Sequence, residues 1–132
     1  MKKMKSITRL DDLNLPKKQN RFILGFLKQA KQINSFPQID MFILFGSCAR
    51  GNANLNSDVD IIAIGNGIGD ETLFDLYDCA GLPELENEYG AVNNDILVND
   101  RKYFDYRTSV VGSLQWRINN EGVILNELLN FD

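Results

Sequence analysis

The chain has 132 residues, a mass of 15.0 kDa and 44% apolar residues, which corresponds to one globular domain with its own core. Its 14 Lys and Arg against 18 Asp and Glu give a net charge of −4, so unaided binding to duplex nucleic acid is not expected. There is no histidine, which excludes Ser-His-Asp and Cys-His catalytic groups and leaves carboxylates and metal ions for catalysis at neutral pH.

The N-terminal part of the chain is expected to contain a loose start followed by one amphipathic helix. Residues 1–16 are polar and without a periodic pattern, which predicts a loosely structured segment within a single domain that covers residues 1–132. From Lys17 onward, apolar side chains recur every three or four residues and share one helix face. These side chains are Ile23, Phe26, Leu27, Ala30 and Ile33. Asn34 and Pro37 end this helix.

Strands and further helices are predicted in the rest of the chain. Three apolar segments have the length of strands, namely Ile39–Phe45, Val59–Ile64 and Ala91–Val98. A short helical turn at Cys48–Gly51 and an asparagine-rich loop lie between the first two. The remaining elements are a helix capped by Asp70 that carries Leu73, Phe74, Leu76, Tyr77 and Ala80, a helical stretch from Pro83 to Glu88, a mostly helical tail over Asp100–Asn119 and a short strand at Val123–Leu125.

No targeting or membrane segment is predicted. The basic residues at the start are not followed by a continuous apolar stretch, which argues against a signal peptide. The longest apolar run, Met41–Phe45, has five residues and is too short to cross a membrane. We therefore expect a cytoplasmic protein.

A Gly-Ser pair and three aspartates form the candidate functional set. Gly46-Ser47 follows a predicted strand, where a glycine lets a ligand approach the backbone and the serine hydroxyl can donate to a phosphate. The same pair is also compatible with an ordinary turn. Asp58 and Asp60 lie two residues apart on a predicted strand and so share one face. Asp95 begins the apolar part of a third strand, and it can reach the same centre if the two strands are neighbours.

Paired carboxylates at the start of a buried strand need a reason, because they repel each other. Hard oxygen ligands of this kind suit Mg²⁺, which proteins commonly hold through one or two carboxylates and the phosphates of the substrate. A solvated strand end is the alternative. A calcium loop of the EF-hand type fails on spacing, because Ile62 and Ile64 stand where oxygen ligands would be needed.

The combination of these elements is more specific than any one of them. Gly46-Ser47, ten intervening residues, Asp58-x-Asp60 and a later strand aspartate resemble the polymerase-β-like nucleotidyltransferase superfamily. The fuller strings resemble its minimal nucleotidyltransferases, a branch that includes antitoxins. They are Phe45-Gly-Ser-Cys-Ala-Arg-Gly51, Ser57-Asp-Val-Asp-Ile61 and Ile118-Asn-Asn-Glu-Gly-Val-Ile-Leu125, and the resemblance spans residues 39–125.

This resemblance implies a fold and a reaction. The implied fold is α/β (α+β), with a mixed β-sheet of three to four strands and helices mainly on one face. The implied reaction transfers a nucleoside monophosphate, AMP from ATP being the family's usual choice, to an acceptor hydroxyl. Gly46 and Ser47 would hold the triphosphate, Asp58 and Asp60 would bind two Mg²⁺ ions, and Asp95 would complete one metal site and help to deprotonate the acceptor.

Three further features leave alternatives open. Arg50 matches an arginine of the family string and could contact phosphate or tie the short helix to a core carboxylate. Cys48 departs from that string and is expected to be a small residue that faces the core. Trp116, Phe104 and Tyr106 have helical spacing and are expected in the core or on a partner surface rather than as a platform for stacking bases.

The resemblance also suggests a partner. Many members of this branch are encoded with a helical HEPN-type toxin and adenylylate one of its tyrosines, which would make this chain an antitoxin. The alternatives are transfer to a small molecule such as an aminoglycoside, which usually requires a second domain, and a catalytically idle binding module. A homo-oligomer is also compatible with the sequence.

Overall fold

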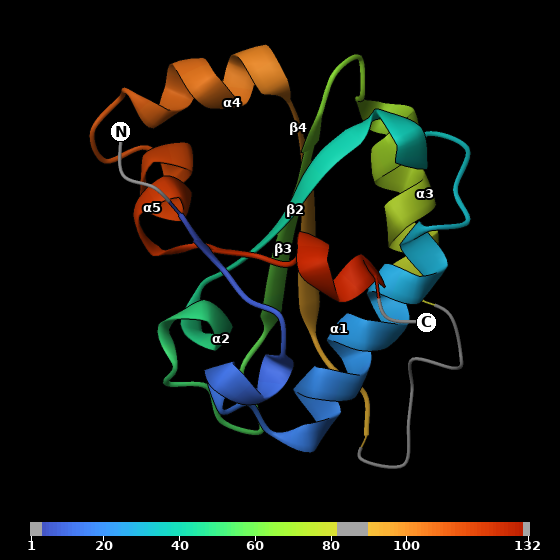
Figure 1. Ribbon diagram of the computed structural model, residues 1–132, viewed down its shortest axis with the longest axis vertical. Helices are drawn as coiled ribbons and strands as arrows, with labels where there is room; N and C mark the ends of the chain where they lie inside the picture. Colours follow the sequence, from blue (N-terminus) through green and yellow to red (C-terminus); the bar gives the residue numbers. More distant parts are fainter. Residues whose placement is uncertain (1–3, 82–89, 131–132) are drawn as a thin grey trace.

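The computed structural model describes residues 4–81 and 90–130, and these contain a five-stranded mixed sheet (Figure 1). The strands lie in the order β1-β5-β2-β3-β4. Their bounds are Lys5–Ser6 for β1, Ile39–Phe45 for β2, Val59–Gly65 for β3, Asn94–Asp100 for β4 and Val123–Ile124 for β5. The predicted mixed α/β class is confirmed, with one or two more strands than expected, whereas the helices cover both faces of the sheet and not mainly one.

The centre of the sheet is formed by the two strands that the sequence predicts best. β2 and β3 are antiparallel, whereas β3 and β4 are parallel, with Asp60 opposite Asp95 in the register. β5 is antiparallel to β2 on its other side and parallel to β1. Since β3 lies between β2 and β4, its residues are flanked on both sides by backbone.

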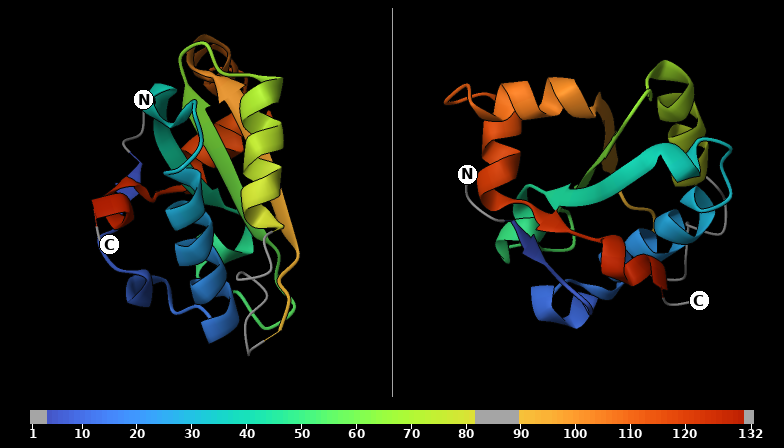
Figure 2. Two further views of the ribbon diagram at one scale, coloured as in Figure 1. Left: turned by 90° about the vertical axis from the view of Figure 1, so that its right-hand side faces the viewer. Right: turned by 45° about the horizontal axis from the view of Figure 1, so that its top comes forward.

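One face of the sheet carries the longer helices, α1 (Lys17–Ala30) and α3 (Asp70–Ala80) (Figures 1 and 2). The predicted apolar face of α1 is confirmed within the helix, because Ile23 at its start and Ala30 at its end are both fully buried. The ring of Phe26 meets Phe42 of β2 edge to face, with 6.2 Å between ring centroids. This core fixes α1 against β2.

The opposite face is covered by α4 (Arg101–Thr108) and α5 (Leu114–Glu121) (Figure 2). Phe104 and Ile118 are buried there against Ile43, Ile62 and Ile64. The predicted mostly helical tail over Asp100–Asn119 is confirmed, but it consists of two helices. Gly112 has φ +87°, a left-handed conformation that interrupts a helix, and Ser113 then caps α5 by accepting a hydrogen bond from the Trp116 amide at 3.0 Å.

The prediction of a loose start is wrong for residues 5–13. β1 pairs with β5, and the Ile7 amide donates to the Ile124 carbonyl at 3.3 Å. Ile7, Leu10 and Leu13 are buried, the last two in a short 3₁₀ helix, η1 (Leu10–Leu13). Their spacing matches neither a strand nor an α-helix for long enough to be recognised in the sequence.

Several boundaries also differ from the prediction. Gly69, and not Asp70, is the N-cap of α3, and Asp70 is the first helical residue. β4 begins at Asn94, three residues later than expected. The helical stretch predicted at Pro83–Glu88 lies outside the described residues. The remaining short elements are α2 (Ser47–Arg50), η2 (Phe36–Gln38) and η4 (Asn126–Asn130). Within the described ranges, no helix has both the length and the apolar character that a membrane crossing requires.

Candidate active site

The candidate site is built where β2 ends and α2 begins. Gly46 joins the two elements with φ +74° and ψ −159°, a combination that is nearly restricted to glycine. A Cβ atom at this position would collide with Oδ2 of Asp60, closer than real Cβ atoms approach another atom. The backbone conformation therefore favours glycine, and an added Cβ would displace the Asp60 carboxylate.

The strand register brings the acids of two strands together. Asp60 in β3 is opposite Phe45 on one side and opposite Asp95 of β4 on the other. Asp58 comes directly before β3, separated from Asp60 by the fully buried Val59. Asp60 is partly buried, while Asp58 and Asp95 are exposed. The strand of Asp95 is therefore a neighbour of the strand of Asp60, which is the condition under which Asp95 can reach the same centre.

The electrostatic state of Asp60 reflects this crowding. Burial, together with the negative charges of Asp95 and Asp58, raises the pKa of Asp60 from 3.8 to about 6. The positive charge of Arg50 acts in the opposite direction but does not cancel the effect. An ionised Asp60 is thus destabilised in the protein alone, and a cation beside it would relieve the repulsion.

The donor set fits Mg²⁺ chemically, although no ready-made site is present. Over residues 4–81 and 90–130, no three Asp, Glu, Cys or His side chains are close enough to hold a metal ion between them. Mg²⁺ usually binds through one or two carboxylates and takes further ligands from water and substrate phosphates. The assignment of Asp58, Asp60 and Asp95 as metal ligands stays a prediction.

Ser47 and Arg50 begin and end α2, beside Gly46. Ser47 is partly buried at the first helical position. Nη1 of Arg50 lies 3.3 Å from Oε2 of Glu121 at the end of α5, and both side chains are nearly half exposed, at 46% and 43%. This partner is a surface carboxylate and not the core carboxylate considered above. Such an exposed pair contributes less than about 1 kcal/mol, so the guanidinium can leave it for a phosphate at little cost.

Cys48 faces the core, as predicted. Its side chain is fully buried in α2, and Sγ lies 3.3 Å from the carbonyl oxygen of Asp58, to which the thiol donates. Burial, followed by the charges of Asp60 and Asp58, raises the pKa of Cys48 to about 11. Cys48 therefore tethers α2 to the backbone of a candidate acid instead of acting as a nucleophile.

We expect both cysteines to be inert in the folded protein. Cys79 in α3 is also buried, and burial raises its pKa. A thiol with a pKa near 11 is about 0.1% ionised at pH 8, and only the thiolate reacts. Labelling with a disulfide reagent at pH 8 should modify neither thiol within minutes and both after denaturation in urea. Rapid labelling of Cys48 in the native state would contradict its placement.

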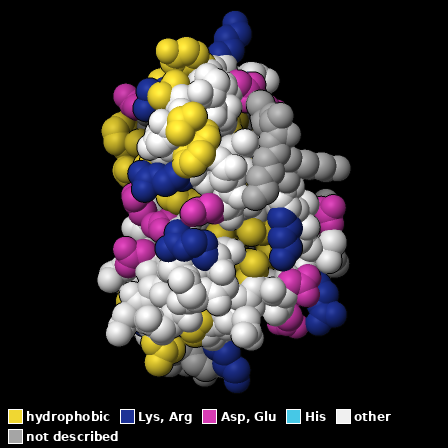
Figure 3. Space-filling model, turned by 90° about the vertical axis from the view of Figure 1, so that its left-hand side faces the viewer, with side chains coloured by type: hydrophobic (Ala, Val, Ile, Leu, Met, Phe, Trp, Pro, Cys, Tyr) yellow, Lys and Arg dark blue, Asp and Glu magenta, His cyan; other side chains and the backbone are white. Residues whose placement is uncertain are grey.

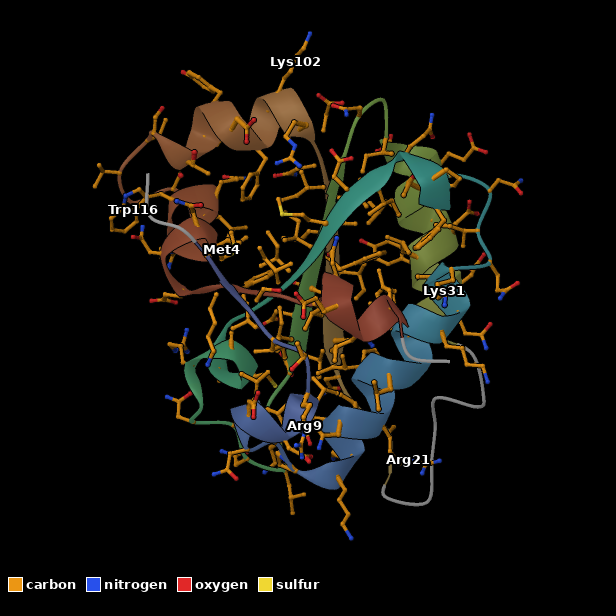
Figure 4. The ribbon with its side chains drawn as sticks, viewed as in Figure 1. Met4, Arg9, Arg21, Lys31, Lys102 and Trp116 are labelled. Carbon is orange, nitrogen blue, oxygen red and sulfur yellow. The ribbon has the colours of Figure 1, made fainter. Side chains whose placement is uncertain are left out.

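The aromatic residues of the tail are divided between core and surface. Phe104 is buried, and Tyr106 is 67% exposed. Trp116 lies on the side of α5 that faces away from the sheet (Figure 4). The expectation of a core or surface location is thus met by Phe104 and Tyr106, and the expectation that they do not stack on a base stays a prediction.

Gln19 contacts the site region, although it was not identified as a candidate in the sequence analysis. It belongs to α1, is fully buried, and donates through Nε2 to the carbonyl oxygens of Asn54, Leu55 and Ser57, just before Asp58. A signal was available, because Gln19 is three residues before Phe22 and four before Ile23, on the apolar face of the helix. A buried polar side chain on such a face must find hydrogen-bond partners.

The sheet, the Gly46 turn and the neighbouring acids define a domain of the nucleotidyltransferase class. Residues 25–116 match the family described as "Nucleotidyltransferase domain", which includes every candidate site residue named above except Gln19 and Glu121. Because this match covers more than half of the chain, the chain belongs to that family.

The chain was also compared with solved structures and with curated proteins. A solved structure at 1.40 Å from Sulfolobus solfataricus, described as a candidate nucleotidyltransferase, is 22% identical to this chain. The similarity covers 82% of each chain with a TM-score of 0.49. A comparison with curated proteins gives no match.

Proposed function

We propose that this protein is a Mg²⁺-dependent nucleotidyltransferase that transfers AMP from ATP to a hydroxyl group of another protein. The observation that supports this most directly is the junction of Gly46, Asp60 and Asp95. The turn at Gly46 lies in close contact with the Asp60 carboxylate, and Asp95 is opposite Asp60 in the adjacent strand. This arrangement combines a backbone that a phosphate can approach with acids that need a cation.

The roles of the residues follow from their positions. Gly46 and Ser47 bind the triphosphate, and Arg50 exchanges Glu121 for a phosphate oxygen when the nucleotide arrives. Asp58 and Asp60 would hold two Mg²⁺ ions with the help of the nucleotide, and Asp95 would complete one of these sites. Ions bound there would neutralise the phosphates and increase the acidity of the acceptor hydroxyl.

The proposed transfer balances without an additional reactant. The acceptor oxygen forms a bond to the α-phosphorus of ATP, while the bond between that phosphorus and the bridging oxygen to the β-phosphate breaks. Pyrophosphate leaves with the electron pair of that bond. Asp95, which is exposed at the sheet edge, accepts the proton of the hydroxyl and passes it to water. A chain without histidine can carry out each of these steps.

A protein acceptor is favoured because the candidate acids are open to the outside. Asp58 and Asp95 are exposed. A pocket of about 310 Å³ lies between α1 and α3, and it is lined by none of the candidate site residues. An incoming loop with a tyrosine can reach carboxylates that are exposed in this way. By family resemblance, a helical HEPN-type toxin is the proposed bearer of that tyrosine.

The exposed surface of α4, α5 and the turn between them supports a partner of this kind. Tyr103, Tyr106, Val111 and Leu114 of α4, α5 and the turn between them are exposed, from 37% to 79%. Figure 3 views this side of the molecule and shows apolar side chains gathered toward the end where α4 lies. Apolar side chains that are exposed together on one surface are typical of protein–protein contact sites.

The proposal is tested by incubating the protein with labelled ATP, Mg²⁺ and a HEPN-type protein encoded beside it. We expect the partner to gain the mass of AMP on a tyrosine, and we expect chelation of Mg²⁺ to abolish the gain. Transfer to a free aminoglycoside, with the protein partner unmodified, would replace the protein acceptor by a small molecule. Absence of any transfer together with tight binding would favour the idle binding module.

Asp95→Asn should reduce turnover by about 100-fold and change nucleotide binding much less, because an amide cannot accept the proton. The measurement is a comparison of the transfer rate with the affinity for ATP and Mg²⁺ from calorimetry. Asp78→Asn removes an exposed acid of α3 and serves as the control, with transfer expected within twofold of the original protein. A wild-type rate for Asp95→Asn would remove Asp95 from the reaction.

A further inference from the structure

The loop that precedes Asp58 contains a turn that is built by its own hydrogen bonds. The Ser57 amide donates to the Asn54 carbonyl at 3.0 Å, and the Asn54 amide donates to Oγ of Ser57 at 2.8 Å. The Asn56 amide donates to Oδ1 of Asn54 at 2.8 Å. The shape of residues 54–57 is therefore set locally, but these bonds do not determine where the turn lies relative to the rest of the domain.

Gln19 fixes that location from α1. Its Nε2 lies 3.1 Å from the carbonyl oxygen of Asn54, 3.3 Å from that of Leu55 and 3.1 Å from that of Ser57. The side chain is fully buried, more than thirty positions before the residues that it contacts. Three carbonyl oxygens thus accept from one amide group, and an apolar side chain at this position would remove the donor for all three.

A second buried side chain holds the next residue from the other direction. The thiol of Cys48 in α2 donates to the carbonyl oxygen of Asp58. The backbone at Ser57 and Asp58 is consequently held between α1 and α2, while the Asp58 side chain remains exposed. This is the arrangement needed for a carboxylate that must be free to bind a ligand but must keep a fixed position.

We propose that Gln19 is a positioning residue for nucleotide transfer, which sets the location of Asp58 by fixing residues 54–57 against α1. The inference rests on the function proposed above and deepens it. Displacement of a reacting or ligating group by about 1 Å can reduce a rate by about 100-fold. Gln19 touches neither substrate nor metal in this proposal and acts only through the turn.

The test uses Gln19→Met, which keeps an unbranched side chain of similar length and removes the donors. Thr72→Val is the matched control. Thr72 of α3 is also buried, and its hydroxyl donates to Oγ of Ser35, in the segment after α1, at 2.8 Å. The readouts are hydrogen exchange at the amides of Ser57 and Val59 without nucleotide, the transfer rate and the affinity for ATP with Mg²⁺. Concentrated sucrose keeps a weakened variant folded during the comparison.

We expect Gln19→Met to accelerate exchange at both amides by at least about tenfold and to reduce transfer by at least about 30-fold. Thr72→Val, at a similar loss of stability, should change both by less than about twofold. Unchanged exchange, or a loss of transfer no larger than in Thr72→Val, would overturn the role of Gln19 while leaving the proposed function intact. If the original protein neither binds nor transfers nucleotide, the proposed function fails and the role of Gln19 in transfer fails with it.

Discussion

Asp60→Asn is expected to abolish Mg²⁺-dependent nucleotide transfer, by at least about 1,000-fold, and also to stabilise the folded protein without metal. The loss of activity follows because an amide is a poor ligand for Mg²⁺, and the charge stabilisation that a metal provides is worth several kcal/mol. The gain in stability follows because the ionised Asp60 is unfavourable where it stands, partly buried and beside Asp95 and Asp58. The opposite signs of the two effects distinguish a functional carboxylate from a structural one.

The gain in stability should depend on pH in a defined window. The pKa of Asp60 is raised from 3.8 to about 6, so the folded protein holds this proton more strongly than the unfolded chain does. As the pH rises from about 4 to about 6, the unfolded chain loses the proton first, and the free energy of unfolding falls. Above pH 6 the full penalty is present, and we expect about 1–2 kcal/mol because water still reaches the carboxylate.

Urea unfolding at pH 4 and pH 8 checks this expectation. At pH 8 without metal, Asp60→Asn should be more stable than the original protein, and at pH 4 the difference should nearly vanish. Mg²⁺ with a nonhydrolysable ATP analogue should stabilise the original protein and not the variant. A variant that is less stable at pH 8 would show that the Asp60 carboxylate is held by favourable contacts and is no candidate ligand.

The parts of the fold that the sequence predicts best are those with a continuous apolar signal. β2 has the predicted bounds, and β3 extends the predicted strand by one residue, because both are central strands with nearly every inward side chain buried. Asp60 and Asp95 are recognisable for the same reason, since an acid within an apolar strand is conspicuous. Their register across two strands required the structure, because pairing is a tertiary property.

The features that the sequence does not reveal depend on contacts between distant segments. β1 has two residues and exists because it pairs with β5. Gln19 and Glu121 reach the site region across 35 or more positions, to Asn54 and Arg50 respectively. Local patterns contain no information about partners so far away.

Gly46→Ala tests the contact between the turn at position 46 and the Asp60 carboxylate, and it is the second change with a large expected effect. Gly46 has φ +74° and ψ −159°, which costs any other residue about 1–3 kcal/mol. The added Cβ also meets the Asp60 carboxylate, which must move by about 1 Å. We expect a loss of stability of about 3 kcal/mol and a loss of transfer of at least about 100-fold.

Gly51→Ala is the control for the backbone, because Gly51 also has a positive φ, +83°, but a Cβ there meets nothing within 4 Å. It should lose about 1 kcal/mol and retain most of its activity. Since the two glycines differ in ψ, a second comparison isolates the carboxylate: Gly46→Ala in the background of Asp60→Ala. In that background the collision is absent, so the cost of Gly46→Ala in urea unfolding should fall by at least about 1 kcal/mol. An unchanged cost would mean that backbone strain alone requires glycine at position 46, and that the turn is not shaped around Asp60.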